Sequence, residues 1–174
     1  MTPPNRTYNV LILCTGNSAR SILGEVLVNH WGRGRFKGFS AGSHPKGQVH
    51  PDALELIRSL GWPTEGLRSK SWDEFAVPGA PTMDVVITVC DNAAGETCPV
   101  WLGTPTRAHW GLPDPAAVAD PVARRQAFRS ALDVLSARIQ ALTALDPERL
   151  EPAALKQRLD EIALIGSVGS DAAS

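Results

Sequence analysis

This 174-residue sequence has little net charge, few cysteines and no long apolar run. The formal net charge is only −1, so the chain has no general affinity for nucleic acid or anionic membranes, and any anion it binds must be held locally. No apolar run is long enough to cross a bilayer. The first residues, Met1–Thr7, lack the apolar stretch of a secretory signal. We therefore expect a cytoplasmic protein with neither a membrane nor a nucleic-acid partner.

The sequence has 3 cysteines. An odd number argues against a static disulfide framework, and free or catalytic thiols are expected in a reducing compartment. The alternative is that each cysteine is a small buried hydrophobic side chain. The surroundings of each cysteine must decide between the two.

Strand and helix patterns alternate along the chain. Short apolar runs predict strands, and apolar residues that recur every three or four positions predict helices. The predicted strands are Val10–Leu13, Gly38–Ser43, Val85–Val89 and Arg107–Trp110, and the predicted helices are Ser18–Trp31, Pro51–Leu60, Pro121–Leu145 and a short one around Leu155, Leu159 and Ile162. This alternation is typical of βαβ units, so we expect an α/β fold with a parallel sheet covered on both faces.

The length suits a single domain over residues 1–174. Its core is expected at about 8–145, followed by a C-terminal helix at about 152–164 and a loose tail at 166–174. In open parallel sheets, ligands bind outside the carboxyl ends of the strands. Cys14, Cys90 and the segment after Trp110 all follow predicted strands, so we expect them to meet at one rim.

The segment between the first strand and the first helix has the residues of an oxyanion cradle: Cys14, Thr15, Gly16, Asn17, Ser18, Ala19, Arg20 and Ser21. Backbone N–H groups in such a loop can point at a tetrahedral oxyanion, and the planar Arg20 side chain can grip two of its oxygens. The same setting favours a thiolate at Cys14, to which Ser21 can donate a hydrogen bond. Gly16 permits tight backbone geometry, and the Asn17 side chain is the expected internal brace.

The spacing of a cysteine, five residues and an arginine is loose by itself. The same segment could be an ordinary strand–turn–helix, with Ser18 as the helix cap and Arg20 on the surface. The buried strand before it, the helix after it, and the glycine, asparagine and serine around it favour the catalytic interpretation.

Residues 111–116 supply a candidate general acid. Displacing an oxygen from a tetrahedral oxyanion needs a protonated leaving group, and a carboxyl group near the anion can provide the proton. Asp114 has a proline on each side. Asp-Pro is also common in turns, which is the alternative for Asp114. A second such pair, Asp120-Pro121, is better explained as the N-cap and first residue of the long helix.

Cys90 and Cys98 follow the third predicted strand and are separated by seven residues that include a glycine and two alanines. That segment has no apolar periodicity and is able to change shape. Two thiols beside a nucleophilic Cys14 could carry a disulfide away by thiol–disulfide exchange. The alternatives are a buried Cys90 with an incidental Cys98, or a zinc site, although this spacing is unusual for zinc.

Together these residues resemble a known family. The run from Cys14 to Ser21, followed by Ser40-Ala41-Gly42-Ser43, is similar to the low-molecular-weight protein tyrosine phosphatase fold family, and the chain looks like the arsenate reductases that share this fold. The similarity extends from about Asn9 to about Ala116. It implies a three-layer α/β/α architecture with a four-stranded parallel sheet, and it places the general acid at Asp114.

The resemblance also implies a reaction. Cys14 would attack arsenate, Cys90 would attack the Cys14 sulfur and release arsenite, and Cys98 would then attack Cys90. An external thiol reductant would reset the enzyme: thioredoxin, with glutaredoxin and glutathione as the alternative. No bound cofactor is expected, phosphate and sulfate should compete with arsenate, and we expect a monomer.

A potassium site is a further possibility. In some related reductases a glutamate at the position of Glu25 joins Asn17 and Ser40 around a potassium ion. Another carboxylate would be expected near Ser71, where the sequence offers only Asp73, one position off. The alternative for Glu25 is a solvated helix face or a partner for a buried polar group.

Two other functions could use these residues. A phosphatase acting on phosphotyrosine proteins would need Cys14, Arg20 and Asp114, but the acid is followed by Ala116 and Ala117 and not by aromatic residues that grip a phosphotyrosine ring. A thiol-based arsenite or metal sensor would need a DNA-binding or partner-binding element, and there is no basic recognition helix. The sequence therefore favours an arsenate reductase, with residual phosphatase activity.

Overall fold

The computed structural model describes residues 7–90 and 105–166. Its strands and α-helices, in chain order, are β1 (Tyr8–Cys14), α1 (Arg20–Gly32), β2 (Phe36–Gly42), α2 (Pro51–Ser59), β3 (Val85–Thr88), β4 (Thr106–His109), α4 (Pro121–Thr143) and α5 (Pro152–Ile162). Three short 3₁₀ helices lie in the connections: η1 (Trp72–Phe75), η2 (Pro115–Ala117) and η3 (Pro147–Arg149). Every predicted strand and helix is present, with ends displaced by a few residues.

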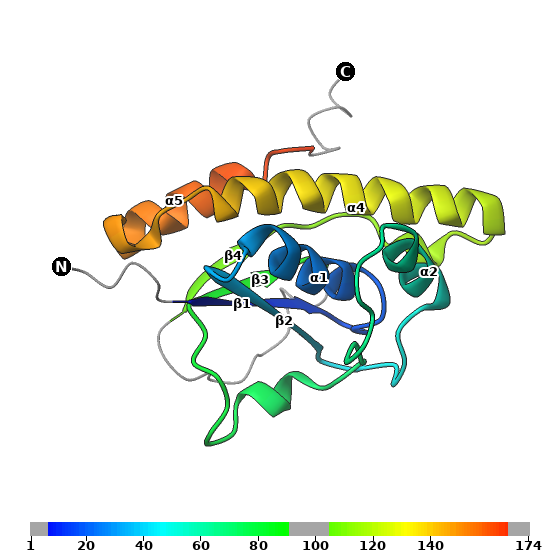
Figure 1. Ribbon diagram of the computed structural model, residues 1–174, viewed down its shortest axis with the longest axis horizontal. Coiled ribbons are helices and arrows are strands. Elements are labelled where there is room, and N and C mark those ends of the chain that lie inside the picture. The colour runs from blue at the N-terminus through cyan, green and yellow to red at the C-terminus, as the bar shows by residue number, and fades with distance from the viewer. Residues whose placement is uncertain (1–6, 91–104, 167–174) are drawn as a thin grey trace.

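The strands form one parallel sheet in the order β2-β1-β3-β4, which confirms the predicted α/β fold. β1 lies inside the sheet, with Val10 opposite Gly38 of β2 and Val85 of β3. In Figure 1 the helices α1, α2, α4 and α5 lie on one side of the sheet, and η1 lies on the other. Among the described residues, α-helices therefore cover one face, and a 3₁₀ helix with its flanking loops covers the other.

Alternating side chains of β1 divide the core between these two faces, as a strand with period two requires. Val10 and Ile12 pack in the larger cluster with the long helices, whereas Leu11 and Leu13 pack in a smaller cluster that includes Trp72 of η1. The predicted apolar stripe of α4 is buried in the larger cluster: Phe128, Leu132, Leu135, Ile139 and Leu142.

The long helix begins where the sequence predicts. Asp120 is its N-cap and accepts a hydrogen bond of 2.8 Å from the Ala123 N–H, and Pro121 follows at the first helical position. Such a cap satisfies a backbone donor that the first turn of the helix leaves unpaired. Across the described ranges, no helix combines the length and apolar character needed to cross a membrane.

Candidate active site

The loop between β1 and α1 turns its carbonyl groups away from its centre. The carbonyl oxygens of Thr15, Gly16 and Ser18 accept hydrogen bonds from the backbone N–H groups of His44, Lys46 and His50, respectively, over 2.9–3.0 Å. In a trans peptide the N–H group points opposite to the carbonyl. Because the carbonyls are held outward, the N–H groups of the following residues face inward, as an oxyanion cradle requires.

Cys14 lies at the base of this cradle and is only 3% exposed. Its sulfur accepts a hydrogen bond of 3.2 Å from the Asn17 N–H, and it lies 2.9 Å from the Ser21 hydroxyl oxygen. Hydrogen bonds to sulfur of this kind favour the thiolate, which is the nucleophilic form of cysteine. The predicted contact between Ser21 and Cys14 is therefore present.

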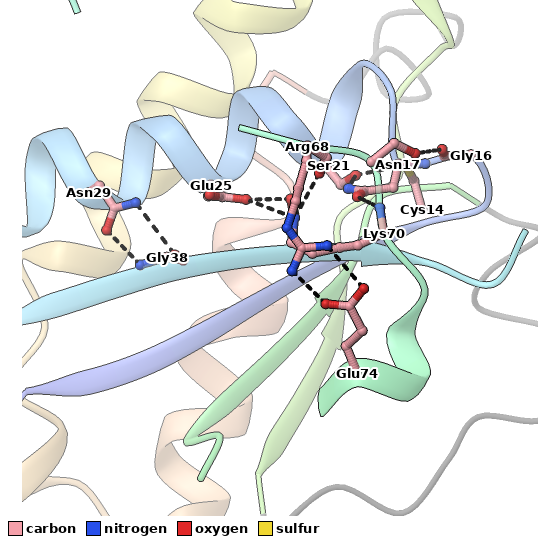
Figure 2. Close-up of polar contacts among 12 residues, drawn as sticks. Cys14, Gly16, Asn17, Ser21, Glu25, Asn29, Gly38, Arg68, Lys70 and Glu74 are labelled. Carbon is pink, nitrogen blue, oxygen red and sulfur yellow. Dashed lines mark hydrogen bonds and ion pairs between the residues drawn. The ribbon is translucent and has the colours of Figure 1, made fainter. Parts of the chain in front are cut away.

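Asn17 is the brace of the cradle, as predicted. Its side-chain amide donates to the Ser21 hydroxyl over 2.8 Å, and its side-chain carbonyl accepts from the Lys70 N–H over 2.8 Å (Figure 2). Its backbone has a left-handed φ of 45°. An asparagine tolerates that conformation better than most residues because its short polar side chain can hydrogen-bond nearby backbone groups.

At Gly16 the missing Cβ atom leaves room for a neighbouring side chain. The positive φ in the cradle belongs to Asn17, and Gly16 is not among the residues with that conformation. A Cβ atom at Gly16 would lie 3.2 Å from Cε of Lys46. The glycine therefore makes room for a lysine side chain that crosses the loop.

A second glycine allows β2 to approach the cradle. A Cβ atom at Gly42 would collide with the carbonyl oxygen of Thr15 and lie 2.9 Å from that of Cys14. Both of these atoms belong to the backbone and cannot swing aside. The Ser40-Ala41-Gly42-Ser43 segment is thus packed directly against the loop that holds Cys14.

Arg20 joins the cradle to the acid-bearing loop. Its guanidinium group donates to the Leu112 carbonyl over 3.0 Å and lies 3.6 Å from Oδ2 of Asp114. The Arg20 side chain is 15% exposed, so it is not a surface arginine. α1 begins with Ala19 as a cap that makes no side-chain hydrogen bond. The alternative of a plain turn capped by Ser18 is therefore wrong.

Asp114 lies at the edge of the same cavity. One carboxylate oxygen accepts a hydrogen bond of 3.0 Å from the Ala116 N–H, and the other faces Arg20. Asp114 is thus also the N-cap of η2, so the turn and the acid interpretations describe the same residue.

Cys90 reaches the cradle from the end of β3. Its sulfur accepts a hydrogen bond of 3.2 Å from the Thr15 N–H and lies 3.4 Å from the Thr15 hydroxyl oxygen. Thr15 follows Cys14 directly in the chain. Cys14 and Cys90 are both free thiols, and both are buried. The structure therefore brings these two cysteines together, whereas Cys98 lies outside the described residues.

A cavity of about 380 Å³ connects these groups. The described residues that line it are Cys14, Thr15, Gly16, Ser18, Ala19, Arg20, His44, Lys46, Cys90 and Asp114. No phenylalanine, tyrosine or tryptophan is in that set, so the described part of the rim has none of these large rings to pack on a phenol ring. Its cations suit a small anion, and the sequence analysis did not anticipate His44 and Lys46 in it.

Glu25 and Ser40 meet below the cradle, as the potassium hypothesis requires, but a lysine meets them there. The Ser40 hydroxyl donates to Oε1 of Glu25 over 2.5 Å, and Nζ of Lys70 lies 3.7 Å from the same oxygen. Glu25 thus has a buried polar partner, which was the alternative to a potassium ligand. Within the described ranges, no group of three or more histidine, cysteine, aspartate or glutamate side chains could hold a metal ion.

Residues 9–158 match the family model of the low molecular weight phosphotyrosine protein phosphatases, and the chain belongs to this family. Among its relatives are proteins named as arsenate reductases. The arsenate reductase of Halalkalibacterium halodurans is 32% identical over 137 residues, which cover 75% of this chain and 91% of that protein.

Solved structures show the same fold. A structure described as an arsenate reductase in the oxidized state has a TM-score of 0.64 and 25% identity, over 79% of this chain and 98% of that one. The thioredoxin-dependent arsenate reductase of Corynebacterium glutamicum has a TM-score of 0.59 and 24% identity. The match covers 78% of this chain and 60% of the length of that protein.

Proposed function

We propose that this protein reduces arsenate to arsenite with Cys14 as the nucleophile and Cys90 as the thiol that receives the first disulfide. The observation that carries the proposal is the position of Cys90. It lines the same anion-sized cavity as Cys14, and its sulfur accepts a hydrogen bond from Thr15, the residue that follows Cys14 in the chain. A phosphatase needs one thiolate in such a cavity, whereas a reductase needs a second thiol beside it.

The first step would form a bond between the Cys14 sulfur and arsenic. The residues proposed to bind the oxyanion are those of the cradle: Thr15, Gly16, Asn17, Ser18, Ala19, Arg20 and Ser21. Arg20 would neutralise the anion, and Asp114 would protonate the departing oxygen so that it leaves as water. The arsenic remains As(V) in this adduct.

The second step would be the reduction. The Cys90 thiolate attacks the Cys14 sulfur, a sulfur–sulfur bond forms, and the sulfur–arsenic bond breaks with its electron pair left on arsenic. Arsenite, As(III), is released and a Cys14–Cys90 disulfide remains. Cys98 would then attack Cys90 and free Cys14, and a dithiol protein such as thioredoxin would reduce the Cys90–Cys98 disulfide. We propose that this cycle runs in the cytoplasm, where reduced thioredoxin is available.

The test is arsenate-dependent NADPH oxidation with thioredoxin and thioredoxin reductase, repeated with glutathione and glutaredoxin. We expect turnover with thioredoxin, none in Cys14→Ser or Cys90→Ser, and a single turnover in Cys98→Ser that ends as the Cys14–Cys90 disulfide. Sustained cycling of Cys98→Ser with thioredoxin would refute the three-thiol relay.

Hydrolysis of an aryl phosphate separates the reductase from the phosphatase. Cys90→Ser keeps Cys14, Arg20 and Asp114, so it should hydrolyse the ester at close to the wild-type rate while it loses arsenate reduction. Rapid ester hydrolysis by the wild type, with no arsenate turnover in either reducing system, would identify the protein as a phosphatase and overturn the proposal.

A further inference from the structure

Lys70 lies directly below the cradle, in the segment that extends the sheet beyond β2. Its carbonyl oxygen accepts a hydrogen bond of 2.9 Å from the Gly42 N–H, and Ser71 forms a parallel bridge with Gly42. The Lys70 side chain is only 8% exposed. Lysine side chains are rarely buried to this degree unless a partner balances their charge.

The ammonium group of Lys70 is surrounded by oxygen. It donates to the Arg68 carbonyl over 2.8 Å and lies 3.7 Å from Oε1 of Glu25, which also accepts from Ser40. Figure 2 shows the Glu25 side chain of α1 directed toward the Lys70 side chain. The Glu25 side chain is itself only 15% exposed. Each charge of the pair therefore depends on the other, because an unpaired buried charge is costly.

The same lysine contacts the cradle through its backbone. Its N–H donates to the Asn17 side chain, which in turn donates to Ser21, the residue beside the Cys14 sulfur. Burial lowers the pKa of Lys70 from its ordinary value, and Glu25 opposes that shift. The position of one cation is thus connected, through Asn17 and Ser21, to the hydrogen bonds around the nucleophile.

We propose that the Lys70 ammonium is a built-in cation that positions the oxyanion cradle, so that this protein binds its anion without an added monovalent cation. An ammonium group and a potassium ion are similar in charge and take the same oxygen ligands. Removing the lysine side chain would leave Glu25, Ser40 and the Arg68 carbonyl around a vacant space. Potassium should then restore what the lysine supplied.

Phosphate binding tests this role. The Kd is obtained from the protection that phosphate gives the Cys14 thiol against iodoacetamide, with the Cys14 peptide followed by mass spectrometry. The chloride concentration is constant, and the cation is either potassium or tetramethylammonium, which is too large to enter. The variants are Lys70→Ala, which opens the space, and Lys70→Met, which keeps most of the side-chain volume. Lys156→Ala, which removes an exposed lysine of α5 that pairs with Asp160, is the matched control.

We expect the wild type and Lys156→Ala to bind phosphate equally in both salts. In tetramethylammonium, Lys70→Ala and Lys70→Met should each lose about tenfold in affinity, because a buried carboxylate loses its counter-charge. Potassium should restore Lys70→Ala and leave Lys70→Met weak. If Lys70→Ala is unfolded in tetramethylammonium, its melting temperature takes the place of the Kd and should rise with potassium chloride.

Three results would overturn the proposal. One is wild-type affinity that itself rises several-fold with potassium. Another is normal affinity of Lys70→Met in tetramethylammonium, which would show that only the volume of the side chain matters. The third is Lys70→Ala that stays equally weak, or equally unstable, in both salts. The role of Lys70 in arsenate turnover rests on the proposed function, but phosphate binding does not, so a failure of one is distinguishable from a failure of the other.

Discussion

The Ser21 hydroxyl oxygen lies 2.9 Å from the Cys14 sulfur, and the direction of that hydrogen bond is determined by a third group. The Asn17 side-chain nitrogen donates to the Ser21 oxygen over 2.8 Å. Since an amide NH₂ can only donate, the Ser21 oxygen is the acceptor in that bond and its own proton is left for the sulfur. Asn17 is oriented in turn by the Lys70 N–H. The thiolate is therefore supported by a directed series of hydrogen bonds.

Ser21→Ala should slow alkylation of the Cys14 thiol by iodoacetamide at neutral pH by about tenfold, because one hydrogen bond to a charged sulfur is lost. The rate is measured on the Cys14 peptide by mass spectrometry. Ser59→Ala is the control, since the Ser59 hydroxyl donates to the Leu56 carbonyl at the exposed end of α2. An unchanged alkylation rate in Ser21→Ala would show that the hydroxyl does not stabilise the thiolate.

Asp114→Asn should slow the hydrolysis of aryl phosphates with poor leaving groups by about a hundredfold, because the departing oxygen is no longer protonated. Esters whose leaving group is already a stable anion should be affected much less. The comparison needs a series of phenyl phosphates and a plot of rate against leaving-group acidity. The same loss across the whole series would assign Asp114 to positioning Arg20 and not to proton donation.

Arg138→Met should destabilise the protein by about 3 kcal/mol and slow the acid-dependent step, because three carbonyl groups, that of Trp110 fully buried, lose their donor. The guanidinium group is held inside the protein and donates to the carbonyls of Trp110, Gly111 and Ile165 over 2.9–3.3 Å. Burial lowers the pKa of Arg138. Two of the three carbonyls begin the loop that bears Asp114.

The measurements for Arg138→Met are urea unfolding and the leaving-group series used for Asp114. Arg129→Met is the matched control on the same helix, because Arg129 is 59% exposed and pairs with Asp133 one turn away. Such an exposed pair contributes roughly 0.3–0.5 kcal/mol. Equal stability of the two variants would show that the Arg138 contacts do not hold the acid loop.

Asp52→Asn should lower the free energy of unfolding at neutral pH by about 1 kcal/mol, and this difference should disappear in acid. The carboxylate accepts a 2.6 Å hydrogen bond from Arg124, which ties α2 to α4 and lowers the pKa of Asp52 below its ordinary value of 3.8. A lowered pKa means that the unfolded chain binds the proton more readily. The stabilisation is therefore present above pH 3.8 and is lost as the pH falls through the lower pKa of Asp52 in the folded protein.

Urea unfolding of the wild type and Asp52→Asn across this pH range checks the sign. Asp133→Asn serves as control, because its carboxylate is 65% exposed. A difference between wild type and Asp52→Asn that persists below the native pKa would mean that the amide disturbs packing and not charge.

Much of this protein was predictable because its signals are local. Among the described residues, the apolar runs and helical spacings located every strand and α-helix, though not the short 3₁₀ helices, since side-chain periodicity depends only on neighbours in the chain. The cradle from Cys14 to Ser21 and the cap at Asp120 were also predictable, because each is a short run with its own hydrogen-bond chemistry. The proximity of Cys90 to Cys14 was predictable because both residues follow strands, and the carboxyl ends of parallel strands lie at one edge of the sheet.

The sequence by itself thus determined the α/β fold, the candidate nucleophile with its cradle, and the candidate acid. Only the tertiary structure decided that Lys70 neutralises Glu25, that Lys46 crosses the cradle and that Arg138 holds the loop before Asp114. The reason is physical: these long side chains reach groups far away in the chain. Periodicity reports whether a residue is buried but not which distant carbonyl or carboxylate folding brings within reach of its charge.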